Sequence, residues 1–404
     1  MPCRDALSPS PSGNMANYLR FHCGDFRKYL LHNRILPIPG RPRASRLLRG
    51  TILEADTSEH YNLSQEHYAQ RLKTCVLLVT VCKSWQILAA GLFYHDIRLQ
   101  SCRHLPDLFH GLRRIDGEGE CFGRYVRRLE FHTTSSGSPS CLPLSEILQL
   151  CPRLEILVRP CPERWDRISC SLPFLKRLEW TETDSNRSDI PSRLSGILKA
   201  APNMRYLALT SDRPDVLAEI SLAPALQTLV LHQSELATSP AVSSAYISSR
   251  ITTLVLHSVI SPALVSFITP LGRHLKVLEF AFAPHVAYSS SQMNKLLSHC
   301  PNIEELVYHL GAPEIASLPS HLQLPRIRQV RLRIDPETWF PYKHVVLAQF
   351  QILAGSPFPG LRTIFLHDTS RSFVRRSSAP KILQLMKERG LAVVYENGCP
   401  VDLV

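Results

Sequence analysis

The sequence lacks several features that would place it in a common functional class. No run of eighteen apolar residues occurs, so we expect no membrane-spanning helix and no membrane partner. The first residues, MPCRDALSPSPSGN, show no apolar stretch after a basic start, which argues against a secretory signal and favours the cytoplasm or nucleus. There is no phosphate-cradling glycine loop, no GxSxG and no HExxH motif. We therefore expect a protein that is not an enzyme and that uses no cofactor.

Close pairs of cysteines are also missing, although the chain has 12 cysteines. Zinc sites normally include at least one CxxC-type pair, so we expect no metal site. Four cysteines recur at intervals of about ten residues, which is too wide for such a site: Cys141, Cys151, Cys161 and Cys170.

Acidic residues are fewer than basic ones, and the formal net charge is +12. Along the sequence the excess is spread out, with its densest stretches at Arg41–Arg49, Arg326–Arg333 and Arg371–Arg376. No aromatic residues are interleaved with them to stack on bases. We interpret these residues as a solvated basic surface and do not expect a nucleic-acid partner.

One pattern recurs ten times, with apolar residues at its first and fourth positions and, in nine copies, at its sixth. Seven copies follow a proline, as in PRLEILV from Pro152, PNMRYLAL from Pro202 and PGLRTIFL from Pro359. The first apolar residues are Val126, Leu154, Leu175, Met204, Leu226, Ile251, Leu275, Ile303, Ile327 and Leu361. Nine steps cover 235 residues, about 26 per unit. This period lies in the range of leucine-rich repeats.

The segments before the prolines predict a helix in each unit. LSEILQLCP, LSGILKAAP and MNKLLSHCP share apolar residues at positions one, four and five, which form one face of a helix. Proline disfavours helix in the residue before it and ends the element. Cys151, Ala201 and Cys300 should therefore occupy one equivalent, buried position, which interprets these cysteines as packing residues.

Each unit is thus a helix, a proline break and a short strand. Stacked units should form a parallel sheet with helices on its convex side, an irregular α/β solenoid of the horseshoe type. The segment PKILQLMKERGLAVVYEN, from Pro380, predicts a last helix that stops at Gly390 and a closing strand.

Upstream of the array, LLVTVCKSWQILAAGLFYHDIRL runs from Leu77 to Leu99. It resembles the C-terminal half of an F-box, in which an aliphatic helix leads into Val-Cys-Lys-x-Trp, here Val81 to Trp85. A second helix and a strand-like tail then lead into the repeats. Together with the leucine-rich repeats, the segment resembles the F-box proteins that fungi carry in large numbers.

This resemblance implies a small helical unit that docks on the Skp-type adaptor of a cullin–RING ubiquitin ligase of the SCF type. The chain would then be a non-catalytic subunit that recruits a protein client. Carried over by position, the implied adaptor-binding residues are Leu36, Pro37, Leu48, Ile52, Leu53 and Val79. The implied core of the box comprises Val81, Trp85, Leu88 and Leu92.

We therefore expect three regions: a disordered tail over 1–34, a repeat array over 106–404 and, as the resemblance implies, an F-box-like helical domain over 35–105. Two alternatives stay open. The unit before the repeats is either a docking domain or a cap on the solenoid. In the second case the chain is a leucine-rich-repeat interaction scaffold with a degenerate box, which contacts nucleic acid through its basic stretches.

The concave face of the sheet is the predicted client-binding surface. Histidines share the position after the third apolar residue in five units: His132, His232, His257, His309 and His367. Two residues earlier, on the same face of the strand, stand Glu130, Glu179 and Glu279 with Val230 and Val255 between them. Arg331 and Arg333 should make the far end of the array basic.

We expect His232 and His257 to lie about 5 Å apart, one strand spacing. The histidines would bind an acidic or phosphorylated segment, chelate a metal adventitiously, or only line a solvated surface. Because recognition surfaces tend to have an apolar centre and a polar rim, the units from Leu226 to Leu256 should contact the client. The client-binding candidates are Val230, His232, Val255, His257, Glu279, His309, Arg331, Arg333 and His367.

Overall fold

The computed structural model describes the following residues: 67–70, 72–74, 77, 91–99, 104–115, 119–131, 144–159, 170–182, 194–211, 216–232, 250–257, 262–281, 290–309, 323–333, 349–355, 358–367 and 379–401. The chain divides into two compact units, Met1–Ala69 and Gln70–Val404. The second unit contains the whole repeat array. The predicted tail over 1–34 and most of the predicted box lie outside the described residues.

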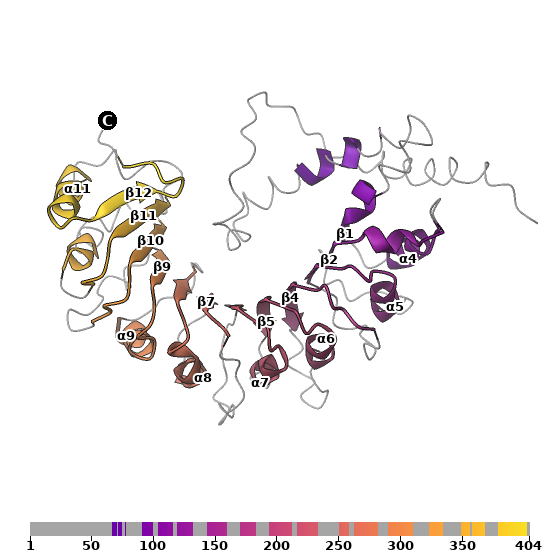
Figure 1. Ribbon diagram of the computed structural model, residues 1–404, viewed down its shortest axis with the longest axis horizontal. Helices are drawn as coiled ribbons and strands as arrows, with labels where there is room; N and C mark the ends of the chain where they lie inside the picture. Colours follow the sequence, from indigo (N-terminus) through magenta and orange to yellow (C-terminus); the bar gives the residue numbers. More distant parts are fainter. Residues whose placement is uncertain are drawn as a thin grey trace, which may run out of the picture. The chain divides into compact units, whose positions relative to one another are not determined.

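Twelve strands of the described residues form one parallel sheet in which every strand pairs with the next in chain order. They are β1 (Asp96–Leu99), β2 (Arg128–Phe131), β3 (Ile156–Val158), β4 (Arg177–Glu182), β5 (Tyr206–Ser211), β6 (Thr228–His232), β7 (Thr253–Leu256), β8 (Val277–Phe280), β9 (Glu305–His309), β10 (Gln329–Arg333), β11 (Thr363–His367) and β12 (Ala392–Tyr395). The strands line the inside of a curve (Figure 1). The predicted α/β solenoid with a parallel sheet is confirmed.

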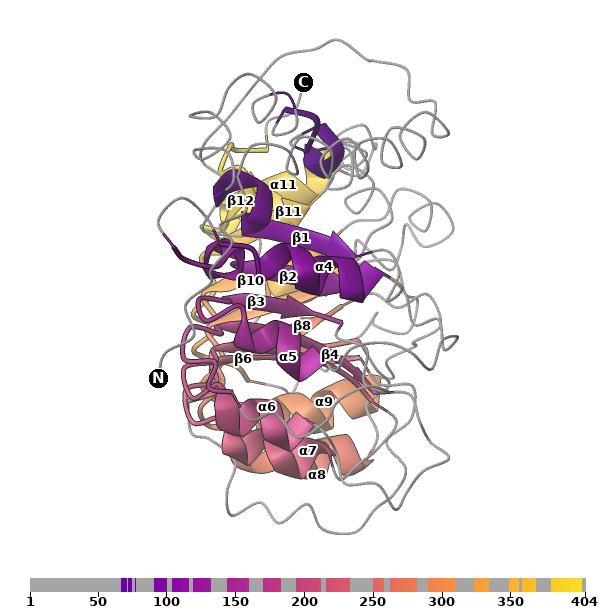
Figure 2. The same ribbon diagram turned by 90° about the vertical axis from the view of Figure 1, so that its right-hand side faces the viewer.

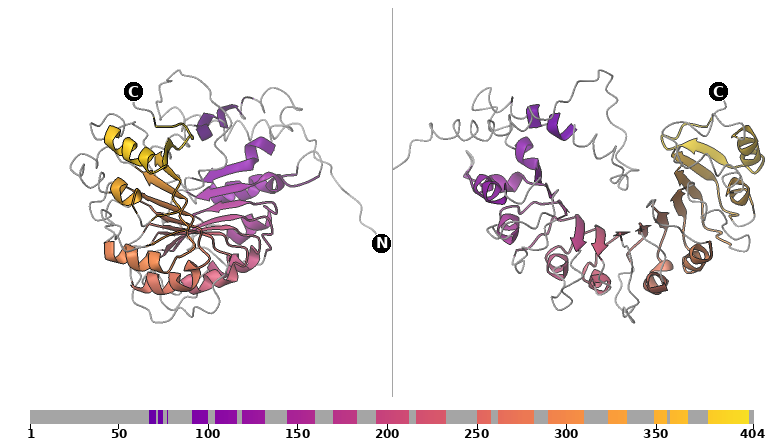
Figure 3. Two further views of the ribbon diagram at one scale, coloured as in Figure 1. Left: turned by 60° about the vertical axis from the view of Figure 1, so that its left-hand side comes forward. Right: turned by 180° about the vertical axis from the view of Figure 1, so that it is seen from behind.

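Helices cover the convex side of this sheet (Figures 1 and 3). They are α4 (Leu105–Leu112), α5 (Leu144–Gln149), α6 (Leu194–Ala200), α7 (Val216–Glu219), α8 (Pro262–Gly272), α9 (Ser290–Ser298) and α11 (Ala379–Glu388), with short 3-10 turns at Phe122–Tyr125 and Ile220–Leu222. Helices α5, α6 and α9 include the apolar positions one, four and five of the three segments that the sequence predicts to be helical. The proline after each segment lies beyond the end of the helix, as expected.

A tight turn joins each helix to the following strand. The backbone N–H of the first apolar residue donates to the carbonyl three residues earlier, from Leu154 to Cys151 at 3.1 Å and from Met204 to Ala201 at 3.2 Å. Proline suits the second position of such a turn because its fixed φ matches the turn. Cys151, Ala201 and Cys300 are 0% exposed. Their predicted role as packing residues is confirmed.

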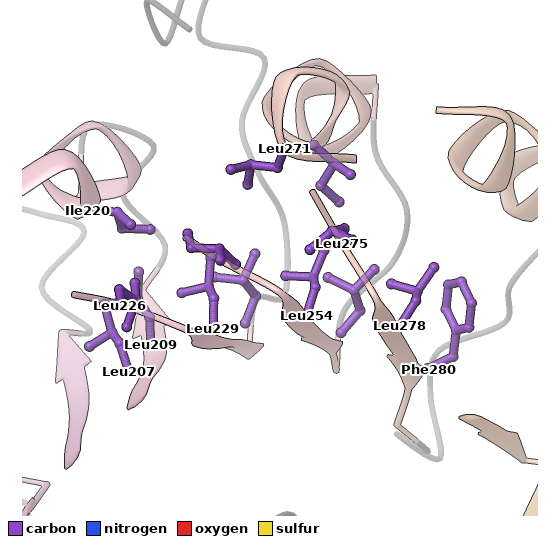
Figure 4. Packing of buried hydrophobic residues seen from close by; sticks show 14 of the residues in the cluster. Leu207, Leu209, Ile220, Leu226, Leu229, Leu254, Leu271, Leu275, Leu278 and Phe280 are labelled. Atoms are coloured by element: carbon purple, nitrogen blue, oxygen red, sulfur yellow. The ribbon is translucent and has the colours of Figure 1, made fainter. Parts of the chain in front are cut away.

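The apolar positions four and six of each unit form the core between sheet and helices. Leu207 and Leu209 of β5 have no exposed surface, and the same holds for Leu229, Leu254 and Leu278 on the next three strands. Their side chains point toward the helical side, where residues such as Leu271 of α8 meet them (Figure 4). Since no unit buries its apolar face alone, the units are stable only as a stack.

Local features close the C-terminal end of the sheet. After α11, Gly390 adopts a left-handed φ of +72° and the Leu391 N–H bonds to the Met386 carbonyl at 2.9 Å. The chain then turns back along β12, so that Tyr395 and Val401 donate to the carbonyls of Cys399 and Val393. These bonds cover the edge strand. The predicted C-terminal cap, with its helix, glycine stop and closing strand, is confirmed.

At the other end, β1 pairs with β2 and belongs to the sheet. The sequence predicted that the array starts at residue 106. The sheet already begins at β1, seven residues or more before that point. The rings of Tyr94 and Phe122 stack at 4.9 Å beside this end. Among the described helices, none is both long and apolar enough to cross a bilayer.

Candidate functional site: the concave face of the sheet

Strand pairing arranges the concave side chains in three columns, because alternate residues of a strand point to the same face. The first column begins each strand and includes Arg128, Arg177, Tyr206, Thr228, Thr253, Glu305 and Thr363. The middle column includes Glu130, Glu179, Ala208, Val230, Val255, Glu279, Val307, Arg331 and Phe365. The last column includes Thr210, His232, His309, Arg333 and His367.

His257 follows β7 and extends the last column beside His232. The two imidazole rings stack with their centroids 4.0 Å apart, which confirms their predicted adjacency. Burial, together with His232 and Arg333, lowers the pKa of His257 to about 3. This imidazole is therefore neutral at physiological pH and offers a ring face and polar nitrogens instead of a charge.

His309 is in a similar state, because burial and the nearby charge of Arg333 lower its pKa to about 3. His367 differs, since its Nδ1 lies 2.6 Å from Oε2 of Glu396. Burial alone would raise the pKa of Glu396, but the hydrogen bond from His367 lowers it overall. The histidine column is therefore not a row of cations, and charge on His257 and His309 cannot be what attracts an acidic segment. His132 lies outside the described residues.

Charged residues at the β1–β4 end of the face compensate one another. Nη2 of Arg128 lies 2.7 Å from Oε2 of Glu130, and Nε of Arg98 lies 3.5 Å from the same oxygen. Burial lowers the pKa of Arg128, but Glu130 and Asp96 outweigh it and raise the pKa overall. Glu130 is only 7% exposed, so its charge depends on these partners.

The β8–β11 end is compensated in the same way. Nη2 of Arg333 lies 2.9 Å from Oε1 of Glu279, and Arg331 forms an ion pair with Glu305. The guanidinium of Arg331 also lies over the ring of Phe365, 4.6 Å from its centroid. The expectation that Arg331 and Arg333 make this end basic is wrong, because each arginine has a carboxylate partner on a nearby strand.

Between these ends lies a stretch of β5 to β7 whose concave positions carry no Lys, Arg, Asp or Glu. At its centre, however, Val230 and Val255 are 2% and 0% exposed, and Glu279 beside them is 2% exposed. These three side chains are not accessible for contact, which corrects their place among the client-binding candidates. The partly exposed candidates are His232, His257, His309, Arg331, Arg333 and His367.

The sequence-based prediction missed the aromatic residues and the carboxylates that hold these arginines in place. Arg177 lies over the ring of Tyr206, 4.4 Å from its centroid, on the adjacent strand. Tyr206 and Glu305 stand at the first strand position, two residues before the column that we singled out. Their spacing of two could have identified them, because it places them on the same face.

The adaptor-binding candidates all lie outside the described residues: Leu36, Pro37, Leu48, Ile52, Leu53 and Val79. The same holds for Val81, Trp85 and Leu88 of the predicted box core. Leu92 is described, and its side chain is 58% exposed. Because its predicted partners lie outside the described residues, its role in the core of the box stays a prediction.

Among the residues that the structure describes, no three His, Cys, Asp or Glu side chains come together as a metal site requires. No protein-family model matches the sequence, and no curated protein matches it either. One solved structure with a similar fold is the leucine-rich repeat-containing protein LegL7 from Legionella pneumophila, at 14% identity and a TM-score of 0.40. The similarity covers 75% of this chain and 94% of that one. The solenoid assignment follows from the twelve-stranded sheet itself.

Proposed function

We propose that the chain is a non-catalytic subunit of an SCF-type cullin–RING ubiquitin ligase that recruits a protein client. The segment before the repeats would dock on the Skp-type adaptor, and the concave face would bind the client. The observation that carries this proposal is the F-box-like segment Val81–Trp85, followed directly by a leucine-rich-repeat array whose sheet begins at β1.

In this arrangement the solenoid covers its own core, and a short helical segment with apolar residues docks on another protein. The chemistry of such a subunit belongs to its partners. Its own contribution is to raise the effective concentration of the client near the transferring enzyme.

On the concave face we propose that the client contacts the partly exposed histidines beside the uncharged stretch of β5 to β7. His232 and His257 would contribute stacked rings and hydrogen-bonding nitrogens. The client segment should therefore be uncharged or weakly charged where it meets them, because no formal charge is left uncompensated on the described concave face to attract one.

Co-purification with a Skp-type adaptor tests the docking. The wild-type chain should retain the adaptor, and a Pro37→Ala, Ile52→Asp variant should lose it, because an aspartate in an apolar contact leaves a charge without a partner. A matched control carries the same substitution types in the array, Pro262→Ala and Ile115→Asp. Both of these side chains are exposed, Ile115 at 68%.

Loss of the adaptor in the first variant and its retention in the control would support docking through the box. If the wild-type chain retains no adaptor, the proposal fails and the scaffold with a degenerate box takes its place. Equal loss in both variants would mean that docking does not depend on the box residues that the resemblance implies.

A further inference from the structure

All strands of the array begin at the same edge of the sheet, because they are parallel and joined by similar turns (Figure 2). We define the turn edge as the two residues that flank the first apolar residue of each of the ten units, such as Arg326 and Arg328 around Ile327. These twenty positions form the turns that enter strands β2 to β11. They lie beside the concave face but do not belong to its three columns.

The turn edge collects most of the excess positive charge of the protein. Nine of its twenty residues are Lys or Arg and two are Glu, a net charge of +7 out of the +12 of the whole chain. The nine are Arg127, Arg153, Lys176, Arg205, Arg250, Lys276, Arg326, Arg328 and Arg362. All except Arg127 are exposed.

Two carboxylates on the edge pair with three of these cations. Glu155 lies 2.8 Å from Nζ of Lys176 and 3.6 Å from Nη1 of Arg127, and Glu304 lies 3.4 Å from Nζ of Lys276. Within the described part of the chain, no carboxylate pairs with the side chains of Arg153, Arg205, Arg326, Arg328 or Arg362. The edge therefore keeps a large uncompensated charge.

The backbone that carries these cations is well fixed. The Ile327 N–H donates to the Leu324 carbonyl at 3.3 Å, and the Leu361 N–H donates to the Phe358 carbonyl at 3.1 Å. Neighbouring turns are also tied together, since Nδ2 of Asn302 donates to the Arg273 carbonyl at 2.6 Å. Successive units follow at about 4.8 Å, the spacing of paired strands. The cations are thus held in a regular row.

We propose that the turn edge binds double-stranded nucleic acid through its phosphate backbone, without sequence preference. Guanidinium groups suit phosphate because their donors match its oxygens in pairs, and seven of the nine cations are arginines. The proposal does not depend on the ubiquitin-ligase role. It also revises our expectation from the sequence, where most of these cations stand about 26 residues apart.

The composition of the edge favours a nucleic acid over an acidic protein surface or a membrane with anionic lipid. Protein interfaces have an apolar core, and stable attachment to a membrane needs a second signal beside charge. The only large apolar side chain exposed among the described turn-edge residues is Phe174, at 50%. Protein–DNA interfaces are more polar and more positive. A duplex fits better than a single strand, because the edge offers no row of aromatic rings for unpaired bases.

The test is a titration of the full chain with a fluorescent DNA duplex of about 20 base pairs and arbitrary sequence, followed by anisotropy. Four or so phosphate contacts should weaken binding about 100-fold between 50 and 200 mM salt. The variant Arg326→Glu, Arg328→Glu, Arg362→Glu should bind at least ~10-fold more weakly, with a salt slope smaller by about 3. The control Lys199→Glu, Lys295→Glu, Lys387→Glu changes the net charge equally on exposed helical positions.

Weakening by the turn-edge variant, with less than about a 2-fold change in the control, supports the proposal. Thermal unfolding of each variant shows whether it is folded, and Arg326→Gln, Arg328→Gln, Arg362→Gln replaces the first variant if it is not. Equal weakening in edge and control variants would overturn the proposal, since net charge alone would then explain binding. It would also be overturned by tighter binding to a single strand, or by binding to vesicles with anionic lipid but not to the duplex.

Discussion

The concave face and the turn edge lie side by side along the same units, but cationic side chains have carboxylate partners on the first and mostly lack them on the second. On the concave face all five described arginines have a carboxylate partner within the face, as in the pairs Arg333–Glu279 and Arg128–Glu130. On the turn edge there are nine cations and only two carboxylates, and those carboxylates pair with three of the cations. The difference is one of position in the repeat, since the second turn-edge residue of each unit is followed directly by the first concave residue, as Arg205 is by Tyr206.

Burial explains why the two surfaces differ. Concave side chains are enclosed by their neighbours on both adjacent strands, and an unpaired charge there would cost several kcal/mol. Turn-edge side chains reach into water, where like charges are screened and cost little. A surface that tolerates unpaired charge is available for an anionic partner, whereas a compensated surface selects partners by shape and hydrogen bonding.

The largest expected effect comes from breaking a concave pair. Arg333→Ala leaves the carboxylate of Glu279 buried without its partner, and we expect the free energy of unfolding to fall by about 3–5 kcal/mol. Urea unfolding measures this loss. Replacing both partners, in an Arg333→Met, Glu279→Leu variant, should recover most of the stability. A single variant as stable as the wild type would show that the pair is not needed.

Acidification should weaken the concave face next. In the folded chain the pKa values of His257 and His309 are about 3, whereas the ordinary value is 6.5. Between these two pH values the unfolded chain therefore binds protons at both histidines and the folded chain does not. Their stabilising contribution is complete above about pH 6.5 and is lost as the pH falls toward 3. Glu279, whose pKa is raised by burial, acts in the opposite direction.

The two imidazoles alone would lower the free energy of unfolding by about 4 kcal/mol between pH 7 and pH 5, and Glu279 makes the net loss smaller. Urea unfolding at the two pH values measures the difference. A His257→Asn, His309→Asn variant should show a flatter pH dependence. An unchanged dependence would mean that these imidazoles are not protected from protonation.

The turn edge should be sensitive to backbone spacing. A Cβ atom at Gly360 would lie 2.3 Å from the Pro325 carbonyl oxygen of the preceding unit, so Gly360→Ala must push two turns apart. We expect a loss of about 1–3 kcal/mol. The matched control is Gly196→Ala in α6, where a Cβ meets nothing within 4 Å and should stabilise the helix by about 0.5–1 kcal/mol. Equal effects of the two substitutions on thermal unfolding would contradict the close approach.

The smallest effect on stability should come from the edge cations themselves. Arg326→Ala and Arg328→Ala remove exposed side chains without a described ion-pair partner, so the free energy of unfolding should change by no more than about 0.5 kcal/mol. Urea unfolding measures the contribution of these arginines to stability, and the duplex titration measures their contribution to binding. A large loss of stability would show that these residues serve the fold and would weaken the contrast with the concave face.

The repeat period and the proline breaks were sufficient to predict the strands, the core and the C-terminal cap, because both are local signals with one structural consequence. The equivalence of Cys151, Ala201 and Cys300 and the contact of His232 with His257 followed from the same alignment of units. The accessibility of individual side chains could not be predicted, because it depends on how neighbouring units pack against each other. Val255 was predicted to be accessible and is buried, because the sequence does not show how closely the neighbouring side chains enclose it.

The distribution of charge was missed for a related reason. Read along the chain, the cations of the turn edge look dispersed, and only Arg326 and Arg328 stand in a dense stretch. Stacking of the units brings residues about 26 positions apart to within one strand spacing. Aligning the ten units and adding charges position by position would have revealed the edge.

The most direct test of the proposed recruiting role is light scattering on a purified mixture of the full chain and a Skp-type adaptor, separated by size. We predict one complex whose mass equals one copy of each protein, and its disappearance with the Pro37→Ala, Ile52→Asp variant. Separate elution of the wild-type chain and the adaptor at micromolar concentration would contradict the role and leave an interaction scaffold with no link to the ligase.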